Sequence, residues 1–138
     1  MSDVISNMQK AFDKPLKQFG TDNSIIIALE NIDAPTDTNT PYIAGFMLGG
    51  DINSADLSVN ESLDGIYQID VNYGSHTGSS KANTMIDKLR AKFPIGSYFY
   101  FGGDCFGVDS MTVTPLPVNN GWAQKSISLT LSAFTARL

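Results

Sequence analysis

Cys105 and His76 are the only cysteine and the only histidine of the chain, and together they have the types needed for a nucleophile and its base. Such a pair usually needs a third group that orients the base. His76, however, lies among Gly and Ser residues, where an exposed histidine is unremarkable. Cys105 precedes Phe106, where a lone thiol is more often a small core residue. The pattern therefore predicts no catalytic residue and no enzyme.

The stretch 102–107, Gly-Gly-Asp-Cys-Phe-Gly, has a composition that cradles phosphates in some proteins. It has neither the lysine of a P-loop nor the glycine spacing of a dinucleotide fingerprint, so a hairpin turn is the better interpretation. The aromatic run 98–101 and Trp122 have the types of a sugar or base platform, but aromatic side chains on strands mostly pack in a core. We expect no cofactor.

Four carboxylates lie in a polar stretch between residues 51 and 64: Asp51, Asp56, Glu61 and Asp64. Asp51 and Asn53 begin like a calcium loop, but Ala55 takes the next ligand position and Asp56 the place of the central glycine. We therefore expect a solvated acidic loop without a metal ion. A loop this long is usually functional or mobile, and we expect contact with a neighbour to order it. These four residues are the candidate interaction residues.

The charge balance disfavours nucleic-acid binding, since 14 acidic residues oppose 9 basic ones, for a net charge of -5. The run Lys88, Arg90 and Lys92 is explained by the helix end on which it lies, and no other basic cluster is apparent. One cysteine excludes an internal disulfide and is compatible with a reducing compartment. No signal peptide or membrane span is expected, so the sequence predicts a soluble cytoplasmic protein.

The elements that must position these residues are centred on the stretch 65–73, in which Tyr67, Ile69, Val71 and Tyr73 alternate with polar residues. This pattern predicts a half-buried strand. From Ser79 or Ser80 the apolar period changes to 3.6, which predicts an amphipathic helix that ends at Phe93-Pro94. The aromatic strand 98–101 follows, and we expect the helix to lie across one face of the sheet.

The N-terminal half has the pattern of one further helix and two further strands. Apolar residues at helical spacing predict a helix from Asp3, which we expect to end near Lys14 or to kink because of Pro15. A turn is expected at 20–23, an interior strand at 24–30, a loop at 31–41 and a strand at 42–48 that Gly49-Gly50 end.

The C-terminal part alternates strand and turn signals. After a turn at 102–104, a short segment at 105–109 and a strand that Pro115-Leu116-Pro117 ends, Asn120-Gly121 is a turn dipeptide. The stretch 122–134 alternates apolar with polar residues and predicts a long strand with one wet side. The whole predicts an α+β fold, mainly an antiparallel β-sheet with two α-helices packed on one face, in a single domain over residues 1–138.

Several of these signatures, in their order and spacing, resemble small tail terminator proteins of long, non-contractile-tailed bacteriophages and prophages. They are the entry Thr40-Pro41-Tyr42, the strand that begins at Asp64-Gly65-Ile66-Tyr67, the helix that ends in Lys92-Phe93-Pro94-Ile95-Gly96, and the strand after Gly121-Trp122. The resemblance covers about residues 41–138 and includes no catalytic motif.

The resemblance implies a structural protein of the virion tail that is assembled in the host bacterial cytoplasm. It implies a hexameric ring at the head-proximal end of the tail tube, which stops tube growth, binds the tube protein and presents a surface to the head–tail connector protein. DNA would pass through the ring without specific binding, and the acidic balance suits this role. The alternatives are another neck or tail-completion protein and, from a different class, a stand-alone module that binds a small ligand.

Overall fold

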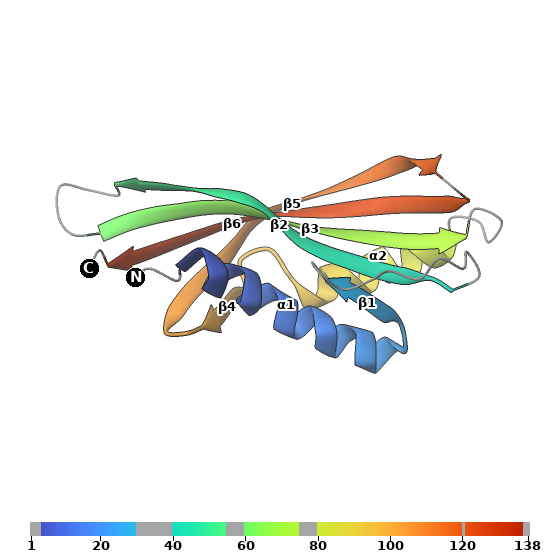
Figure 1. Cartoon of the computed structure of the whole chain (residues 1–138), viewed down its shortest axis with the longest axis horizontal. Helices are drawn as coiled ribbons and strands as arrows, with labels where there is room; N and C mark the ends of the chain where they lie inside the picture. Colours follow the sequence, from blue (N-terminus) through green and yellow to red (C-terminus); the bar gives the residue numbers. More distant parts are fainter. Residues whose placement is uncertain (1–3, 30–39, 55–59, 75–79, 120, 137–138) are drawn as a thin grey trace.

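The computed structural model describes residues 4–29, 40–54, 60–74, 80–119 and 121–136 of the chain (Figure 1). Two helices and six strands alternate along it. In chain order they are α1 (Val4–Asn23), β1 (Ile26–Leu29), β2 (Tyr42–Ser54), β3 (Asn60–Gly74), α2 (Ser80–Lys92), β4 (Tyr98–Phe101), β5 (Asp104–Asn119) and β6 (Trp122–Ala136).

The six strands form one sheet in the order β1-β2-β3-β6-β5-β4, in which every neighbouring pair is antiparallel except β1 and β2. Both helices lie on the same side of this sheet (Figure 1). The other side, which we call the open face, carries no helix among the described residues. The predicted α+β fold, mainly antiparallel with two helices on one face, is confirmed.

Helix α1 continues through Pro15, so the prediction that it ends near Lys14 is wrong. Proline removes one backbone hydrogen bond and crowds the preceding turn, which costs roughly 3 kcal/mol in a helix interior. The side chains of Phe12, Leu16 and Phe19 lie on both sides of it and are buried against the sheet. Burial of each is worth roughly 1.5–3 kcal/mol, which together exceeds the cost of the proline.

The predicted turn at 20–23 is the last turn of α1, and the chain reverses at Ser24 instead. Ser24 has a positive φ of 54°, its N–H donates to the Thr21 carbonyl at 3.4 Å, and the Ile25 N–H donates to the Gly20 carbonyl at 3.0 Å. This pair of bonds is the Schellman motif, which satisfies carbonyls at a helix C-terminus. A left-handed residue after Asn23 therefore ends the helix.

Strand β1 exists as predicted, but it lies at the edge of the sheet and not in its interior. Ile26 is exposed, while Ile27 lies against Gly20 of α1, where an added Cβ would come within 2.3 Å of the Ile27 side chain. Leu29 packs in the core, while Ile26 remains exposed at the edge of the sheet. The loop predicted at 31–41 falls almost entirely outside the described residues.

The prediction of a loop from Asp51 to Asp64 is wrong for all its described residues. Strand β2 continues through Gly49-Gly50 to Ser54 and pairs with β3 from Asn60 onwards, with Ile52 opposite Leu63. The register shifts by one residue between Met47 and Gly50, which is a β-bulge, a position where glycine is favoured. Backbone pairing stabilises this hairpin, so polar side chains do not exclude a strand.

Strand β3 and helix α2 match their predictions closely. Tyr67, Ile69, Val71 and Tyr73 are buried on the helix side, and α2 ends at Lys92, before Pro94. The buried residues of α2 recur at the predicted helical spacing: Ala82, Met85, Ile86 and Leu89. The change of the apolar period from 2 to 3.6 residues therefore predicted the positions of both elements correctly.

Strand β5 is longer than predicted, because the segment 105–109 and the following strand are one strand that also runs through the two prolines to Asn119. It bulges between Val108 and Ser110, and again after Leu116. Since β4 pairs only with Asp104–Gly107, the later part of β5 has β6 as its one strand neighbour among the described residues. Proline is tolerated at such an edge because its missing N–H can point away from the ladder.

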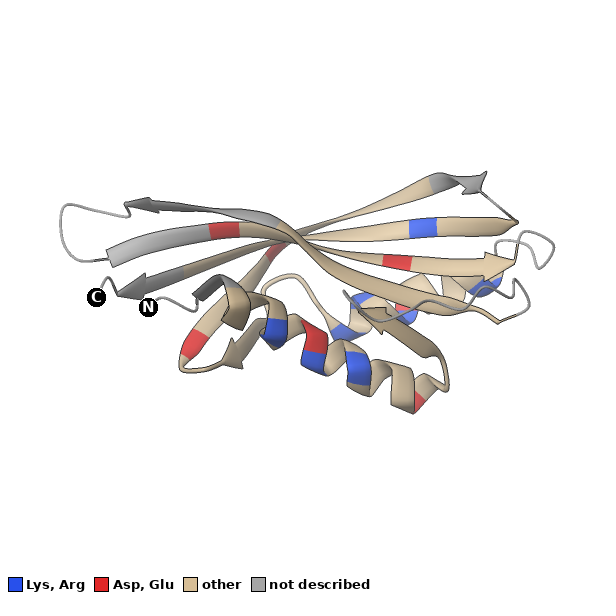
Figure 2. Ribbon diagram, viewed as in Figure 1, with Lys and Arg blue, Asp and Glu red and all other residues tan. Residues whose placement is uncertain are grey.

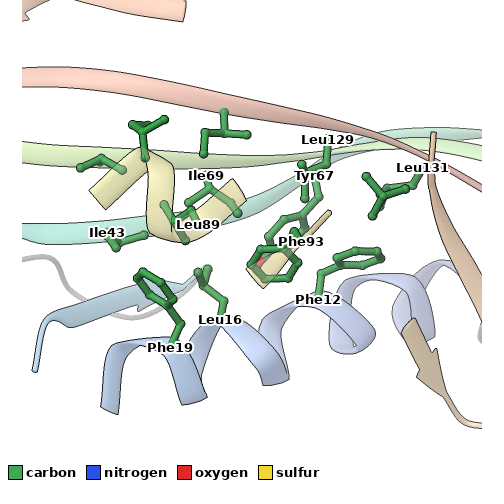
Figure 3. Packing of buried hydrophobic residues seen from close by; sticks show 14 of the residues in the cluster. Phe12, Leu16, Phe19, Ile43, Tyr67, Ile69, Leu89, Phe93, Leu129 and Leu131 are labelled. Atoms are coloured by element: carbon green, nitrogen blue, oxygen red, sulfur yellow. The ribbon is translucent and has the colours of Figure 1, made fainter. Parts of the chain in front are cut away.

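The core lies between the sheet and the helices, around the ring of Phe12 (Figure 3). The centroid of this ring is 4.8 Å from that of Phe99, 5.7 Å from Tyr67 and 6.0 Å from Phe93. Gly45 lets α1 approach the sheet, because an added Cβ would lie 2.5 Å from a methyl carbon of Leu16 and 2.6 Å from the Tyr67 hydroxyl. The sequence position of Gly45, in the middle of an apolar strand, follows from this contact.

Candidate interaction surfaces

The structure places the predicted interaction residues on a hairpin and not in a loop. Asp51 and Asp64 are direct partners on β2 and β3, and Glu61 lies on β3 three residues before Asp64. Asp64 is exposed, whereas Asp56 lies outside the described residues. The role of these residues in binding a partner stays a prediction.

Asp64 lies one strand away from a hollow that was not predicted from the sequence and that Asp109 lines. It lies opposite Ser132 of β6, whose hydroxyl donates to the Asp109 carboxylate at 3.0 Å. A hollow of about 330 Å³ opens beside this pair, and Tyr98 and Gly107 line it. Because β3 and β6 alternate, and Tyr67 and Leu131 face the helices, Asp64 and Ser132 belong to the open face. We call this site the open-face hollow.

The exposure of Tyr98 contradicts the expectation that the aromatic residues of 98–101 are core. Tyr98 and Tyr100 are 64% and 71% exposed, while Phe99 and Phe101 face α1 and pack against the core. The alternation of Tyr with Phe was the signal available in the sequence, because a phenol tolerates water on one side. Asp109 had no comparable signal, since it lies in the β5 bulge and bulges are not apparent from the sequence.

A hydrogen-bonded polar network occupies the middle of the open face. The Asp70 carboxylate accepts hydrogen bonds from the Ser126 hydroxyl and from Gln68 Nε2, the latter at 2.8 Å, and Gln124 donates to Asn72. Asn72 is only 1% exposed and Ser126 only 4%. The face predicted to be the wet side of β6 is therefore wet only in part.

Two aromatic residues, Tyr42 and Trp122, bound this network at one end of the sheet. Their ring centroids lie 5.0 Å apart and the ring planes are perpendicular, an arrangement that aromatic pairs favour. Burial, and secondly the charge of Asp70, raise the pKa of Tyr42 above its ordinary value. The Tyr42 hydroxyl therefore stays protonated at neutral pH and adds no charge to this face.

The helices gather most of the basic residues of the chain on the side away from the open face (Figure 2). Seven of the 9 Lys and Arg residues lie on them: Lys10, Lys14, Lys17, Lys81, Lys88, Arg90 and Lys92. Against these the helices carry only three acidic residues: Asp13, Asp22 and Asp87. The expectation that the chain has no basic cluster is therefore wrong, because residues distant in sequence share one surface.

The strands have the opposite balance. Six acidic residues lie on them, namely Asp51, Glu61, Asp64, Asp70, Asp104 and Asp109, against one basic residue, Lys125. Lys125 points to the helix side, where its ammonium donates to Asn83 of α2. An exposed ion pair joins Arg90 and Asp87 within α2 at 3.8 Å. Asp104 lies on the helix side, where it accepts a hydrogen bond from Asn7 of α1 at 3.0 Å. The described charged residues of the open face, Asp64, Asp70 and Asp109, are acidic, whereas the helix side is mainly basic.

The structure does not test the pairing of Cys105 with His76, which lies outside the described residues. Cys105 is half-buried and lines the open-face hollow, so the expectation of a core position is wrong. A hydrogen bond with Cys105 raises the pKa of Tyr100, its partner on β4. In the described part of the chain, no three metal-ligating side chains come together and no helix is long and apolar enough to cross a membrane.

A family profile described as phage tail terminator protein matches residues 7–130. The chain belongs to the phage tail terminator family. Comparison of this terminator-family protein with solved structures finds a chain with a TM-score of 0.71 and 19% sequence identity, over 96% of this chain and 95% of that one. At this identity the likeness shows a shared fold. The comparison with curated proteins finds no match.

Membership of the family has two direct consequences. The terminator-family protein is a structural component of phage tails, which interacts with other tail proteins. The family is one of structural proteins, which suggests that the chain is not an enzyme. The resemblance found in residues 41–138 is confirmed, and the matched region also includes most of α1.

Proposed function

We propose that this protein caps the head-proximal end of the tail tube as a hexameric ring, stops tube polymerisation and presents the surface that joins the head connector. The single observation that carries the proposal is the match to the terminator family over residues 7–130. The proposal also takes the chain as one domain, assembled with the tube protein in the host cytoplasm.

The physical basis is the way in which a tube stops growing. Each ring of a tube buries one face and exposes an equivalent face that accepts the next ring, a head-to-tail contact that does not close on itself. A terminating subunit must reproduce the accepting contact on one side only. The unequal charge of the helix side and the open face supports such a role, because it favours head-to-tail packing of the copies, and a ring built head to tail has two unlike ends.

DNA can pass through the ring only if the ring does not bind the phosphates of the DNA backbone. A net charge of -5 favours this, because DNA binding is driven by cations that replace its counterions. The open face supports the same conclusion, because its described charged residues, Asp64, Asp70 and Asp109, are all acidic. Cations of the helices must then be kept away from the channel.

The test is electron microscopy of phage lysates that lack this protein. We expect tails of abnormal or uncontrolled length that do not join heads, and restoration of both when the wild-type chain is supplied from a plasmid. Tails of normal length that carry joined heads would rule the proposal out. In tails completed with the supplied chain, six copies should form the ring at the head-proximal end.

A further inference from the structure

The basic side chains of α2 and the open-face hollow are two surfaces of opposite charge that do not contact each other in the described part of the molecule. Lys81, Lys88 and Arg90 are exposed on α2, and only Arg90 has an ion-pair partner among the described residues. Asp109, which lines the hollow, and Asp64, opposite the lining residue Ser132, are both exposed, and Asp109 accepts one hydrogen bond from that serine. Among the described residues, Lys81, Lys88, Asp64 and Asp109 therefore have no ion-pair partner.

Geometry prevents the two surfaces from meeting within one molecule. Lys81 and Lys88 lie beside Tyr73, at the end of β3, whereas Asp64 lies nine positions earlier on the same strand. At 3.3 Å per residue this separates the surfaces by roughly 30 Å. They also lie on opposite faces, since α2 packs on the side of Tyr73 and Asp64 belongs to the open face. A second molecule is needed to bring them together.

We infer that α2 of one copy docks on the open-face hollow of the next copy, so that its lysines meet Asp64 and Asp109. The inference rests on the proposed ring and names the contact that builds it. The hollow, at about 330 Å³, is lined by the exposed ring of Tyr98 and by a carboxylate. An ammonium group placed there gains an ionic contact and an aromatic face.

Charge also selects the symmetry of the contact. A two-fold contact uses the same patch of both copies, so it could pair α2 with the hollow only if both lay on one patch, and they lie on opposite faces. Any other two-fold contact would place α2 against α2 or hollow against hollow, and like charges in apposition are unfavourable. A head-to-tail contact pairs opposite charges at every interface, and it closes into a ring when the rotation between copies is a whole fraction of a turn. The same contact covers the cations of α2, which would otherwise retain DNA if they faced the channel.

The first test is the salt dependence of self-association, measured by sedimentation of the purified full chain. We expect multimers at low ionic strength, and a dissociation constant that rises at least about tenfold between roughly 50 mM and roughly 500 mM salt. Association that is independent of salt would overturn the inference, and so would a chain that stays monomeric up to millimolar concentration.

Charge exchange is the sharper test. Variant A carries Lys81→Glu and Lys88→Glu, and variant B carries Asp64→Lys and Asp109→Lys. For each variant alone, the dissociation constant of self-association should rise at least about tenfold, because two like-charged surfaces then meet. An equal mixture should recover it, because the acidic α2 of A pairs with the basic hollow of B while the unchanged surfaces pair with each other. An alternating ring closes only with an even number of copies, as in a hexamer.

The matched control carries Lys14→Glu and Lys17→Glu on α1, with the same net charge as variant A. It should associate like the wild type; if it loses association equally, the total charge and not α2 is responsible, and the inference fails. Circular dichroism checks that each variant is folded. A mixture of A and B that fails to recover, while both are folded, also overturns the docking.

The proposed role in tail termination and the docking of α2 can fail independently of each other. If lysates lacking the protein give tails of abnormal length but variant A restores them as well as the wild type does, termination stands and the α2 docking is wrong. If such lysates give normal tails with joined heads, while A and B associate only with each other, the docking stands and the proposed function is wrong.

Discussion

At the scale of single residues, the environment of a side chain decides what its type can do. Ser24 ends α1 in a left-handed conformation that glycine usually adopts, and Tyr98 is a surface residue although its neighbour Phe99 is core. Asp70 has a carboxylate held by hydroxyl and amide donors on the open face. In each case the neighbours, and not the residue type alone, set the role.

The first prediction concerns Tyr42 at alkaline pH. Burial and the charge of Asp70 raise the pKa of Tyr42 above its ordinary value of 10.0. Below pH 10 the phenol is protonated in both the folded and the unfolded chain, so the free energy of unfolding does not depend on this group. Above it the unfolded chain loses its proton first, so the free energy of unfolding falls as pH rises through the folded-state pKa.

The measurement is chemical denaturation of wild type and Tyr42→Phe in a series of buffers on both sides of this pH. We expect a smaller loss of stability with pH in the variant. Part of the loss should remain, because burial also raises the pKa of Tyr73. An unchanged slope in Tyr42→Phe would show that the folded protein does not discriminate against the charged phenol.

At the scale of elements, packing overrides local signals. Helix α1 continues through a proline, β2 continues through two glycines and β5 through a Pro-Leu-Pro sequence. In α1 the buried stripe compensates for the proline, and in β2 and β5 a bulge takes up the irregularity while the ladder continues on both sides. In this protein, proline and glycine therefore mark irregular positions within helices and strands and not the ends of these elements.

The second prediction is that Pro15→Ala stabilises the protein. The substitution restores an N–H that can donate to the Ala11 carbonyl and removes the clash of the ring with that turn, and alanine is the best helix former. The unfolded chain gains some freedom, so we expect a net gain of about 1–3 kcal/mol in the free energy of unfolding. Urea denaturation followed by circular dichroism measures it. Lys14→Ala, at the exposed neighbouring position, is the control and should change stability by less than about 0.5 kcal/mol.

At the scale of the whole molecule, one core joins both helices to all the central strands. The cluster includes Phe12 of α1, Leu89 of α2, Tyr67 of β3 and Leu129 of β6, so no part of the described sheet has a core of its own. The segregation of charge also belongs to this scale, because the basic side is assembled from α1 and α2, which are distant in sequence.

The third prediction follows from this shared core: the chain unfolds as a single domain. Trp122 is the only tryptophan, and its ring lies beside Tyr42 at one end of the sheet, so its fluorescence reports that end. Far-ultraviolet circular dichroism reports the helices. Because both depend on one core, thermal unfolding by the two signals should give the same midpoint. Two separated midpoints would indicate independent units.

The sequence by itself determined the elements whose pattern is regular over many residues. The alternation from Tyr67 to Tyr73, the helical period of α2 and the alternation after Trp122 each predicted an element that the structure contains. The α+β class and the family resemblance followed from the order of these elements. Local periodicity suffices for this, because burial of one face is imposed along the element itself.

Only the tertiary structure decided what depends on neighbours distant in sequence. The hairpin that contains Asp51 and Asp64 exists because β2 and β3 pair, and β1 is an edge strand because no further strand pairs with it among the described residues. The hollow at Asp109 needs β4, β5 and β6 together, and the basic side needs both helices on one face. Cross-strand register and the assembly of a surface are long-range properties, so no window of the sequence contains them.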